Sequence, residues 1–322
     1  AASSLLITGT SGVLMGYLAS LIWQIRRKQG VLGQPLACAS SSGLGSVPTG
    51  VAMLDYSRIG DSIRRLRPRV VVHGASPADP RDFVRDPVGC LDANILLTRE
   101  IAEACASTGA ALLFVSSGEV YGINPLSPTD EYSYGALDHS LSRNVYAEAK
   151  RAGETYILSF GREYGLDARV VRLFHTFGPG INHKGSRVFS GLVEAANCGE
   201  PFRMRSDGKG IRSILYSFDA MSGIAYTLFH RPAVSVTNVA SEVALSINEL
   251  ASRAMSAMAP NLVPNIIYEK SADTLPFESN IHRNVADNKR LRETGWIPQV
   301  DVEDAFVRTL KSLRWRQQRG SG

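Results

Sequence analysis

A tyrosine and a lysine four residues apart are the first side chains in this sequence that could do chemistry together. Tyr146 and Lys150 lie in the segment Asn-Val-Tyr-Ala-Glu-Ala-Lys, and in a helix this spacing places both on one face. A phenol near an ammonium ion and a cationic ring can lose its proton well below its usual pKa of about 10. Tyr146 could then take the proton of an alcohol while a hydride leaves the adjoining carbon.

Three polar side chains follow the apolar run 110–115. Ser116, Ser117 and Glu119 end this run within the segment Val-Ser-Ser-Gly-Glu-Val-Tyr-Gly, and they form either a turn or part of a site. Ser117 could share the hydrogen bond to the alcohol that Tyr146 deprotonates. The choice depends on the elements that hold these residues.

Short apolar runs alternate with longer stretches of helical periodicity through the first half of the chain. The expected strands cover 4–8, 35–39, 70–73, 110–115 and 168–173, and the expected helices cover about 13–28, 91–107 and 143–164. This alternation predicts an α/β fold with a doubly wound parallel sheet and right-handed crossovers. Because ligands bind at the carboxyl ends of such strands, we expect Ser116, Ser117 and Glu119 at the binding edge.

A glycine turn follows the first expected strand and opens the first expected helix. In the segment 7–16, Gly9 and Gly12 permit a tight turn around Ser11 and a close approach to a diphosphate. The free N–H groups of the helix start would bind that anion, so this order predicts dinucleotide binding. The third glycine of the usual spacing would fall on Met15, which requires different packing or a shifted turn.

The acid expected about 20 residues farther on, where it would hold the adenosine ribose, is missing. The second strand ends in serines instead, and Ser40 could bind a ribose hydroxyl or a 2′-phosphate. The choice between NAD and NADP is therefore open. Asp55 is a second candidate for the adenine end, although a helix cap explains it equally well.

Composition and charge exclude several other classes of protein. The four cysteines, at 38, 90, 105 and 198, show no metal-binding or redox spacing, so we expect buried thiols in a reducing, cytoplasmic compartment and no metal site. The net charge of +5 comes without an aromatic-interleaved basic patch, which argues against nucleic-acid binding. It does suit a small substrate that carries phosphate.

The mostly apolar run 13–25 could be mistaken for a membrane span. It is shorter than the roughly 20 residues that a bilayer requires. Its basic residues, at 26–28, follow it, whereas a signal peptide carries them before its apolar region. We therefore expect a buried helix and no membrane association.

Taken in order, these motifs resemble the extended short-chain dehydrogenase/reductases of the nucleotide-sugar epimerase/dehydratase kind. The matching pieces begin at the glycine turn and include 70–80, 114–122, 146–150, 170–180, 198–219 and 291–298. Within this group the chain is most similar to UDP-glucuronate decarboxylases, whose His-Leu-Ala-Ser-Pro-Ala segment corresponds to His-Gly-Ala-Ser-Pro-Ala here. The resemblance covers about residues 4 to 311.

The resemblance implies a reaction and roles for particular residues. Tyr146, with Lys150 and Ser117, would oxidise the sugar at C4 with bound NAD, and the 4-keto sugar would then lose CO2, lose water or epimerise before reduction. Glu119 would lie beside the sugar, because decarboxylases and 4,6-dehydratases carry an acid there. The resemblance also implies that His175, Arg187 and Arg212 bind the nucleotide sugar. Ala75 would contact the cofactor, and Asn94 would support the active-site water or helix.

Three positions depart from the decarboxylase pattern. Gly118 replaces a polar residue, His175 replaces an asparagine, and Gly180 replaces an arginine. His175 could still donate to a sugar or phosphate, or it could be structural. These departures keep a 4-epimerase or a 4,6-dehydratase open as alternatives to a decarboxylase.

The resemblance also implies a division of the chain. We expect a Rossmann domain over 1–178, a smaller and partly interleaved lobe over 179–315 that binds a UDP-linked nucleotide sugar, and a loose tail over 316–322. The helices at 91–107 and 143–164 would pair in a homodimer, as in the family. The rival of another class is a non-catalytic dinucleotide sensor, which would not need the Ser117, Tyr146 and Lys150 set.

Overall fold

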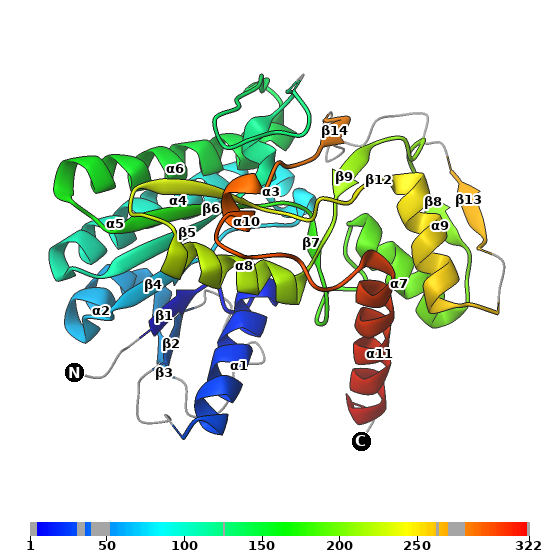
Figure 1. The fold of residues 1–322 in the computed structure, drawn as a ribbon, viewed down its shortest axis with the longest axis horizontal. Coiled ribbons are helices and arrows are strands. Elements are labelled where there is room, and N and C mark those ends of the chain that lie inside the picture. Colours follow the sequence, from blue (N-terminus) through cyan, green and yellow to red (C-terminus); the bar gives the residue numbers. More distant parts are fainter. Residues whose placement is uncertain are drawn as a thin grey trace.

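The structure is a computed structural model that describes residues 5–30, 36–39, 52–124, 126–261, 264–269 and 281–320. Its centre is a seven-stranded sheet in the order β11-β6-β5-β4-β1-β2-β3 (Figure 1). The strands are β1 (Leu5–Thr8), β2 (Leu36–Ala39), β3 (Ala52–Leu54), β4 (Val70–His73), β5 (Ala111–Ser117), β6 (Ala168–Leu173) and β11 (Ser235–Val239). All neighbours pair in parallel, which confirms the predicted doubly wound fold.

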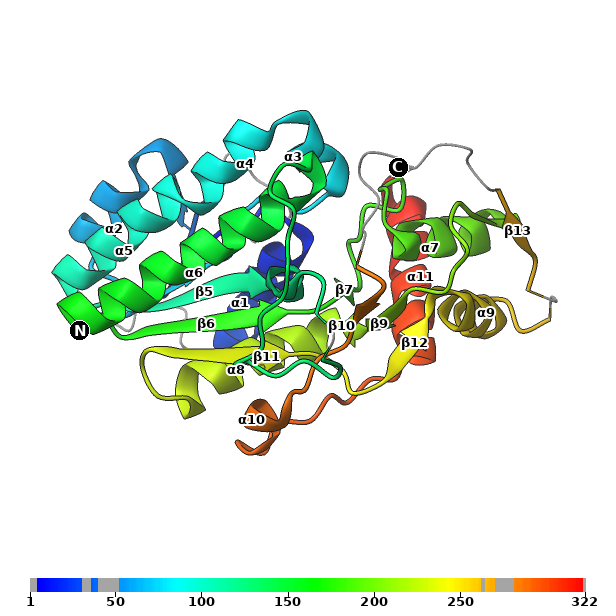
Figure 2. The same ribbon diagram turned by 90° about the horizontal axis from the view of Figure 1, so that it is seen from above.

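Alternate residues of each strand build a separate core on each face of the sheet. In β1, Ile7 packs with α1 (Val13–Lys28) and α8 (Ser217–His230). Its neighbour Leu6 packs on the other face. The helices over that face are α2 (Ile59–Leu66), α5 (Leu96–Thr108) and α6 (Val145–Tyr164) (Figure 2). This two-residue alternation is the expected pattern of strands covered on both sides.

The helix expected over 91–107 is wrong as a single element. The chain forms α4 (Pro87–Asn94) and α5, which are separated at Ile95 with φ −109°. Asp86 caps α4 by accepting a hydrogen bond from the Gly89 amide, while α5 and α6 both end at a left-handed glycine. The short elements near these helices are 3-10 turns at 56–58, 118–121 and 142–144 and α3 (Pro80–Arg85).

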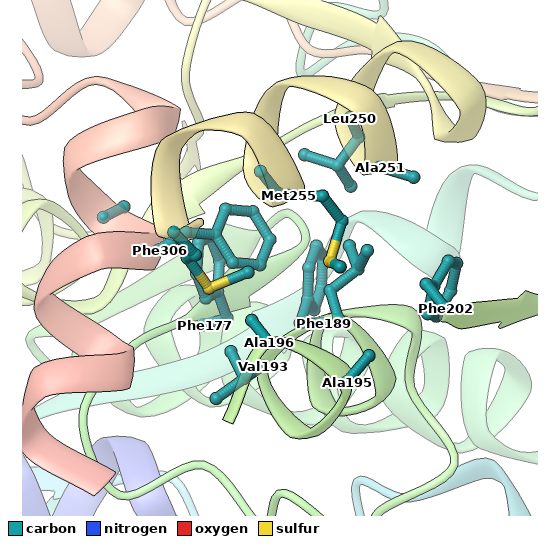
Figure 3. Packing of buried hydrophobic residues seen from close by; sticks show 14 of the residues in the cluster. Phe177, Phe189, Val193, Ala195, Ala196, Phe202, Leu250, Ala251, Met255 and Phe306 are labelled. Atoms are coloured by element: carbon teal, nitrogen blue, oxygen red, sulfur yellow. The ribbon is translucent and has the colours of Figure 1, made fainter. Parts of the chain in front are cut away.

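A second group of helices lies beside the sheet in both views (Figures 1 and 2) and encloses a second core. It is formed by α7 (Val188–Cys198), α9 (Ile247–Met258) and α11 (Val302–Gly320). Phe177 lies at its centre, 4.3 Å from the Phe306 ring and 4.9 Å from the Phe189 ring (Figure 3). The remaining elements are β7 (Thr176–Phe177), β8 (Phe202–Met204), β9 (Ile211–Ser213), β10 (Leu215–Tyr216), β12 (Ala244–Ser246), β13 (Ile266–Tyr268), β14 (Arg283–Asn284) and α10 (Lys289–Arg292).

The chain crosses between the two cores more than once. After α7 and the strands beside it, α8 and β11 return to the main sheet, and the buried Trp296 also packs there. The expected loose tail is wrong for the residues that the structure describes, since α11 continues to Gly320. Within the described ranges, no helix is both long enough and apolar enough to cross a membrane.

Candidate functional site

The carboxyl end of β5 and the start of α6 bring together the tyrosine, the lysine and a serine. Lys150 is 2% exposed, and its Nζ donates to the Val115 carbonyl at 2.8 Å. The same nitrogen lies 5.8 Å from the centre of the Tyr146 ring. Ser117, the last residue of β5, interacts with the Tyr146 phenol. The arrangement places a phenol and an amine at the edge where parallel sheets bind ligands.

Burial shifts the pKa values of both groups toward their neutral forms. Burial, and after it the negative charge of Glu119, raise the pKa of Tyr146 to about 12, against the opposing effects of Arg187 and Ser117. Burial also lowers the pKa of Lys150 to about 7. Near neutral pH the phenol therefore keeps its proton until another positive charge enters the site.

Glu119 lies at this edge and is held by an arginine that we did not predict as a site residue. Arg143 donates to both carboxylate oxygens, at 2.7 and 3.0 Å. The two side chains are 10% and 19% exposed, respectively. Arg143 lies three residues before Tyr146, in the 3-10 turn that opens α6, and its position within the family-like segment was the available signal.

Ser116 does not belong to the site, so that expectation is wrong. It is buried, and its hydroxyl donates to Glu154 at 2.5 Å. Arg172 of β6 is the third member of this buried hydrogen-bonded group, because it donates to Glu154 at 2.7 Å. Successive residues of a strand point to opposite faces, so Ser116 ties β5 to α6 and β6 while Ser117 faces the phenol.

The glycine turn has the shape that a dinucleotide diphosphate requires. Gly9 has φ +80°, and a Cβ there would lie 2.7 Å from the Ala75 backbone. Gly12 precedes α1 with no side chain capping the helix, and Ser11 is exposed beside it. The helix start therefore keeps amide donors for an anion, and the turn and Ala75 fit NAD.

A glycine on β4's extension compensates for the missing third glycine. Met15 is buried, and its side chain occupies the space beside Gly74, where a Cβ would lie 2.5 Å from Met15 Cγ. The next helix residue, Gly16, approaches the Thr10 carbonyl so closely that a Cβ would lie 2.7 Å from it. The turn is therefore kept, and the packing between helix and strand is different.

The other predicted cofactor residues have separate environments. Ser40 lies outside the described residues. Asp55 is exposed and caps the turn at 56–58, because its Oδ1 accepts from the Ser57 amide at 2.9 Å.

Asn94, expected to support the active-site water or helix, is fully buried, and its Nδ2 donates to the Cys90 carbonyl at 2.8 Å. Its buried Oδ1 has no hydrogen-bond partner among the described residues, which leaves an acceptor for a water or ligand.

Positive charge surrounds His175. Burial lowers the pKa of His175 well below its usual value, and the cations of Arg212, Arg187 and Arg143 lower it further. Its buried Nε2 has no hydrogen-bond partner in the described part of the chain. A neutral imidazole that can still donate one hydrogen bond, among three guanidinium groups, is suited to an anionic ligand.

Two of these arginines are held by backbone carbonyls. Arg212 donates to the carbonyls of Ile281 and His282 at 2.7 and 3.0 Å. Arg187 is exposed and donates to the Ala78 carbonyl. Carbonyls carry no formal charge, and Glu119 is the carboxylate that acts on Arg212, so both guanidinium groups are cations that a diphosphate could bind.

The remaining departures from the decarboxylase pattern have structural counterparts. A Cβ at Gly118 would lie 2.8 Å from the buried Phe174 ring, so this ring fills the space of the missing polar side chain. At Gly180, the guanidinium of Arg316 lies 3.4 Å from the position that a Cβ would take. An arginine from α11 therefore lies beside the place of the missing one.

Known proteins resemble this chain in both sequence and fold. The chain is 26% identical over 246 residues to UDP-glucuronic acid decarboxylase 6 of Arabidopsis thaliana, covering 76% of this chain and 70% of that protein. It is 27% identical over 244 residues to UDP-glucuronic acid decarboxylase 1 of Xenopus tropicalis, covering 76% of this chain and 56% of that protein. The chain thus spans little more than half the length of some relatives.

Solved structures match nearly the whole chain. The UDP-glucose 4-epimerase of Thermotoga maritima, crystallised with UDP-glucose, superposes with a TM-score of 0.84 at 21% identity, covering 98% of this chain and 99% of that one. MoeE5 in complex with UDP-glucuronic acid and NAD superposes with a TM-score of 0.79 at 20% identity, covering 97% and 99%. These similarities establish the Rossmann-type fold.

The family itself follows from a match to a family model. The model of the NAD dependent epimerase/dehydratase family matches residues 5–240, a range that contains the glycine turn, Ser117, Tyr146, Lys150 and Arg212. The chain therefore belongs to the NAD dependent epimerase/dehydratase family, whose members are enzymes with NAD as their cofactor.

Proposed function

We propose that this enzyme modifies a UDP-linked sugar through a transient 4-keto intermediate, and that UDP-glucuronate decarboxylation is its reaction. The observation that carries the proposal is the Ser117, Tyr146 and Lys150 set at the end of β5, with Glu119 beside it and Arg212 close enough to interact with Glu119. Relatives named UDP-glucuronic acid decarboxylase and a neighbour complexed with UDP-glucuronic acid and NAD support this choice.

In this proposal Tyr146 is the base that accepts the proton of the sugar 4-hydroxyl. NAD supplies the hydride acceptor and, through its cationic ring, a positive charge near the phenol. Lys150, whose Nζ lies 5.8 Å from the centre of the Tyr146 ring, stabilises the phenolate when it is protonated, and Ser117 orients the hydroxyl that reacts. The raised pKa of Tyr146 keeps the phenol protonated in the free protein, so the base forms only after the site is filled.

We assign the nucleotide diphosphate to the cationic side of the site. Arg212 and Arg187 donate hydrogen bonds to backbone carbonyls, and guanidinium groups bind phosphate oxygens in pairs of hydrogen bonds. His175 Nε2 would donate the third hydrogen bond. Glu119 would face the sugar from the opposite side, close to C5, where decarboxylation and dehydration both act.

The alternatives are a 4-epimerase and a 4,6-dehydratase. The structural neighbour with UDP-glucose is an epimerase, and 4-epimerases often lack the acid that this chain has in Glu119. Decarboxylases and dehydratases both carry a polar residue where this chain has Gly118, and the Phe174 ring leaves no room for one, so this position does not separate the two reactions. We rank decarboxylation first because Glu119 is present and the relatives are named decarboxylases, followed by epimerisation or dehydration.

We further propose the biological setting of the enzyme. Residues 1–178 would bind the cofactor and 179–315 mainly the sugar nucleotide, while α5 and α6 would pair with those of a second copy. Cys38, Cys90 and Cys105 are buried free thiols and Cys198 is an exposed one, which is consistent with the reducing cytoplasm.

Incubation with candidate sugars tests the reaction. The protein with NAD should convert UDP-glucuronic acid into a product that has lost CO2, and mass spectrometry separates this product from loss of water and from an unchanged mass. UDP-glucose and UDP-N-acetylglucosamine serve as competing substrates. Product from UDP-glucose alone, with unchanged mass, would select the epimerase.

The Tyr146→Phe variant tests the mechanism. Removing one hydroxyl leaves the ring stacked on Phe83, 5.1 Å away, so the fold should persist while turnover falls by at least about 10²-fold. An active Tyr146→Phe variant would contradict the assigned base. A wild-type protein that binds NAD but turns over none of these sugars would favour the sensor alternative.

A further inference from the structure

Arg143 links the carboxylate of the site to the catalytic phenol by two separate contacts. The first contact is an ion pair, in which Arg143 donates to both oxygens of Glu119 at 2.7 and 3.0 Å. The other is the Phe83 ring, whose centre lies 5.1 Å from the Arg143 guanidinium carbon. Phe83 in turn stacks on Tyr146 at 5.1 Å, with 15° between the ring planes.

These contacts are sheltered from water. Phe83 is 1% exposed, and the Arg143 and Glu119 side chains are 10% and 19% exposed. A charge in such surroundings acts on its neighbours more strongly than on a surface, because less water screens it. A bidentate arginine also fixes the carboxylate geometrically.

We propose that Arg143 is a positioning residue that neutralises Glu119 and fixes the ring stack, and thereby sets the pH at which Tyr146 becomes a base. This inference rests on the proposed function of Tyr146. Without Arg143, the unpaired Glu119 carboxylate would oppose formation of the Tyr146 phenolate. Without Glu119, the Arg143 cation would favour that phenolate.

Other charged or titratable groups also act on this phenol. They are Glu119 from the turn after β5, Lys150 from α6, Cys90 from α4 and Arg187 before α7, together with the Ser117 hydroxyl. Glu119 is the carboxylate among them, and Arg143 is its ion-pair partner. A change to the Arg143–Glu119 pair should therefore alter the negative charge near Tyr146 more than a change to any other of these groups.

Four variants separate this role from a structural one. Arg143→Met should move the acid limb of the kcat/KM profile upward by about one pH unit, and Glu119→Gln should move it downward by about as much. The double variant should return the limb close to its wild-type pH. Arg143→Lys keeps the charge and should also stay close to the wild type. Arg308→Met, which breaks the exposed Arg308–Asp304 pair on α11, is the matched control and should change nothing.

A second readout does not depend on turnover. In NAD-saturated protein labelled with 13C at the tyrosine ring, the Tyr146 signal is identified by its absence in Tyr146→Phe, and its titration should follow the same order among the variants. That order without turnover of any sugar would uphold the inference and reject the proposed function. Turnover with an unshifted acid limb in Arg143→Met, or equal shifts in both single variants, would overturn the inference and leave the proposed function standing.

Discussion

Burial opposes ionisation at both members of the Tyr146 and Lys150 pair. The pKa of the tyrosine is raised to about 12 and that of the lysine is lowered to about 7, although a charged lysine would help the phenolate to form. The free protein thus holds the pair in its least reactive state. Such opposed shifts beside a binding edge are typical of groups that react only when a ligand completes the charge balance.

The buried lysine leads to a prediction about stability. Between pH 7 and about 10 the unfolded chain binds a proton at Lys150 that the folded chain has partly lost, since the folded pKa lies below the unfolded one. The free energy of unfolding should therefore rise with pH in this window. Relative to Lys150→Met, the wild type should gain about 2 kcal/mol from pH 7 to pH 9.

Urea denaturation of both proteins without NAD at several pH values measures this difference. The Lys150→Met variant provides the reference because it keeps a side chain of similar length without a charge. Parallel stability curves for the two proteins would show that Lys150 keeps an ordinary pKa in the fold.

At the scale of elements, a residue larger than the expected one on α1 is matched by a residue smaller than the expected one after β4. The resemblance places glycine at 15 and leucine at 74, whereas this chain has Met15 and Gly74. The methionine fills the space next to the glycine, so the helix keeps its distance from the sheet. Each substitution is understandable only beside the other, because protein interiors tolerate neither gaps nor overlaps.

A double-mutant cycle tests this exchange. Gly74→Leu alone should destabilise the fold by about 1–3 kcal/mol, because a side chain there overlaps Met15. Met15→Gly alone should cost about 2–5 kcal/mol through the cavity and the helical glycine. The double variant should cost less than the sum by about 1–3 kcal/mol in urea unfolding. Strict additivity would mean that the two positions do not compensate each other.

At the scale of the whole molecule, two kinds of contact organise the fold around the site. One joins the parts of the chain: Ser186 donates to Asp79 at 2.7 Å, beside the Arg187 bond to Ala78. Because Asp79 also caps α3, the segment before α7 is fastened next to the helix that carries Phe83. The other contact is the proposed pairing of α5 and α6 with a second copy.

The proposed dimer is tested on an exposed ring of α6. Tyr164 is 60% exposed and lies with Glu103 and Glu163 on the α5–α6 surface, so Tyr164→Asp should add repulsion between acidic surfaces and yield a monomer in sedimentation velocity. Phe229→Asp, on α8 and 74% exposed, is the control and should remain a dimer. A monomeric wild type at micromolar concentration would contradict the pairing.

The sequence alone determined the order of elements, the sheet type and the family, because these depend on local periodicity and on motifs read along the chain. The strands that we expected at 70–73 and 168–173 are β4 and β6. The break at Ile95, the helical end of α11 and the structural role of Ser116 were not accessible in this way. Each depends on a neighbour that is distant in sequence or on the local backbone conformation.

Only the tertiary structure decided which residues lie side by side. Arg143 and Glu119 are separated by 24 positions along the chain, and Met15 and Gly74 by 59, so no spacing rule connects them. Their partnership exists because the crossovers of a doubly wound sheet bring the turn after β5, the start of α6 and the glycine turn to one edge. A linear pattern can name the groups that do chemistry, but their protonation states depend on burial and on distances that only the folded chain has.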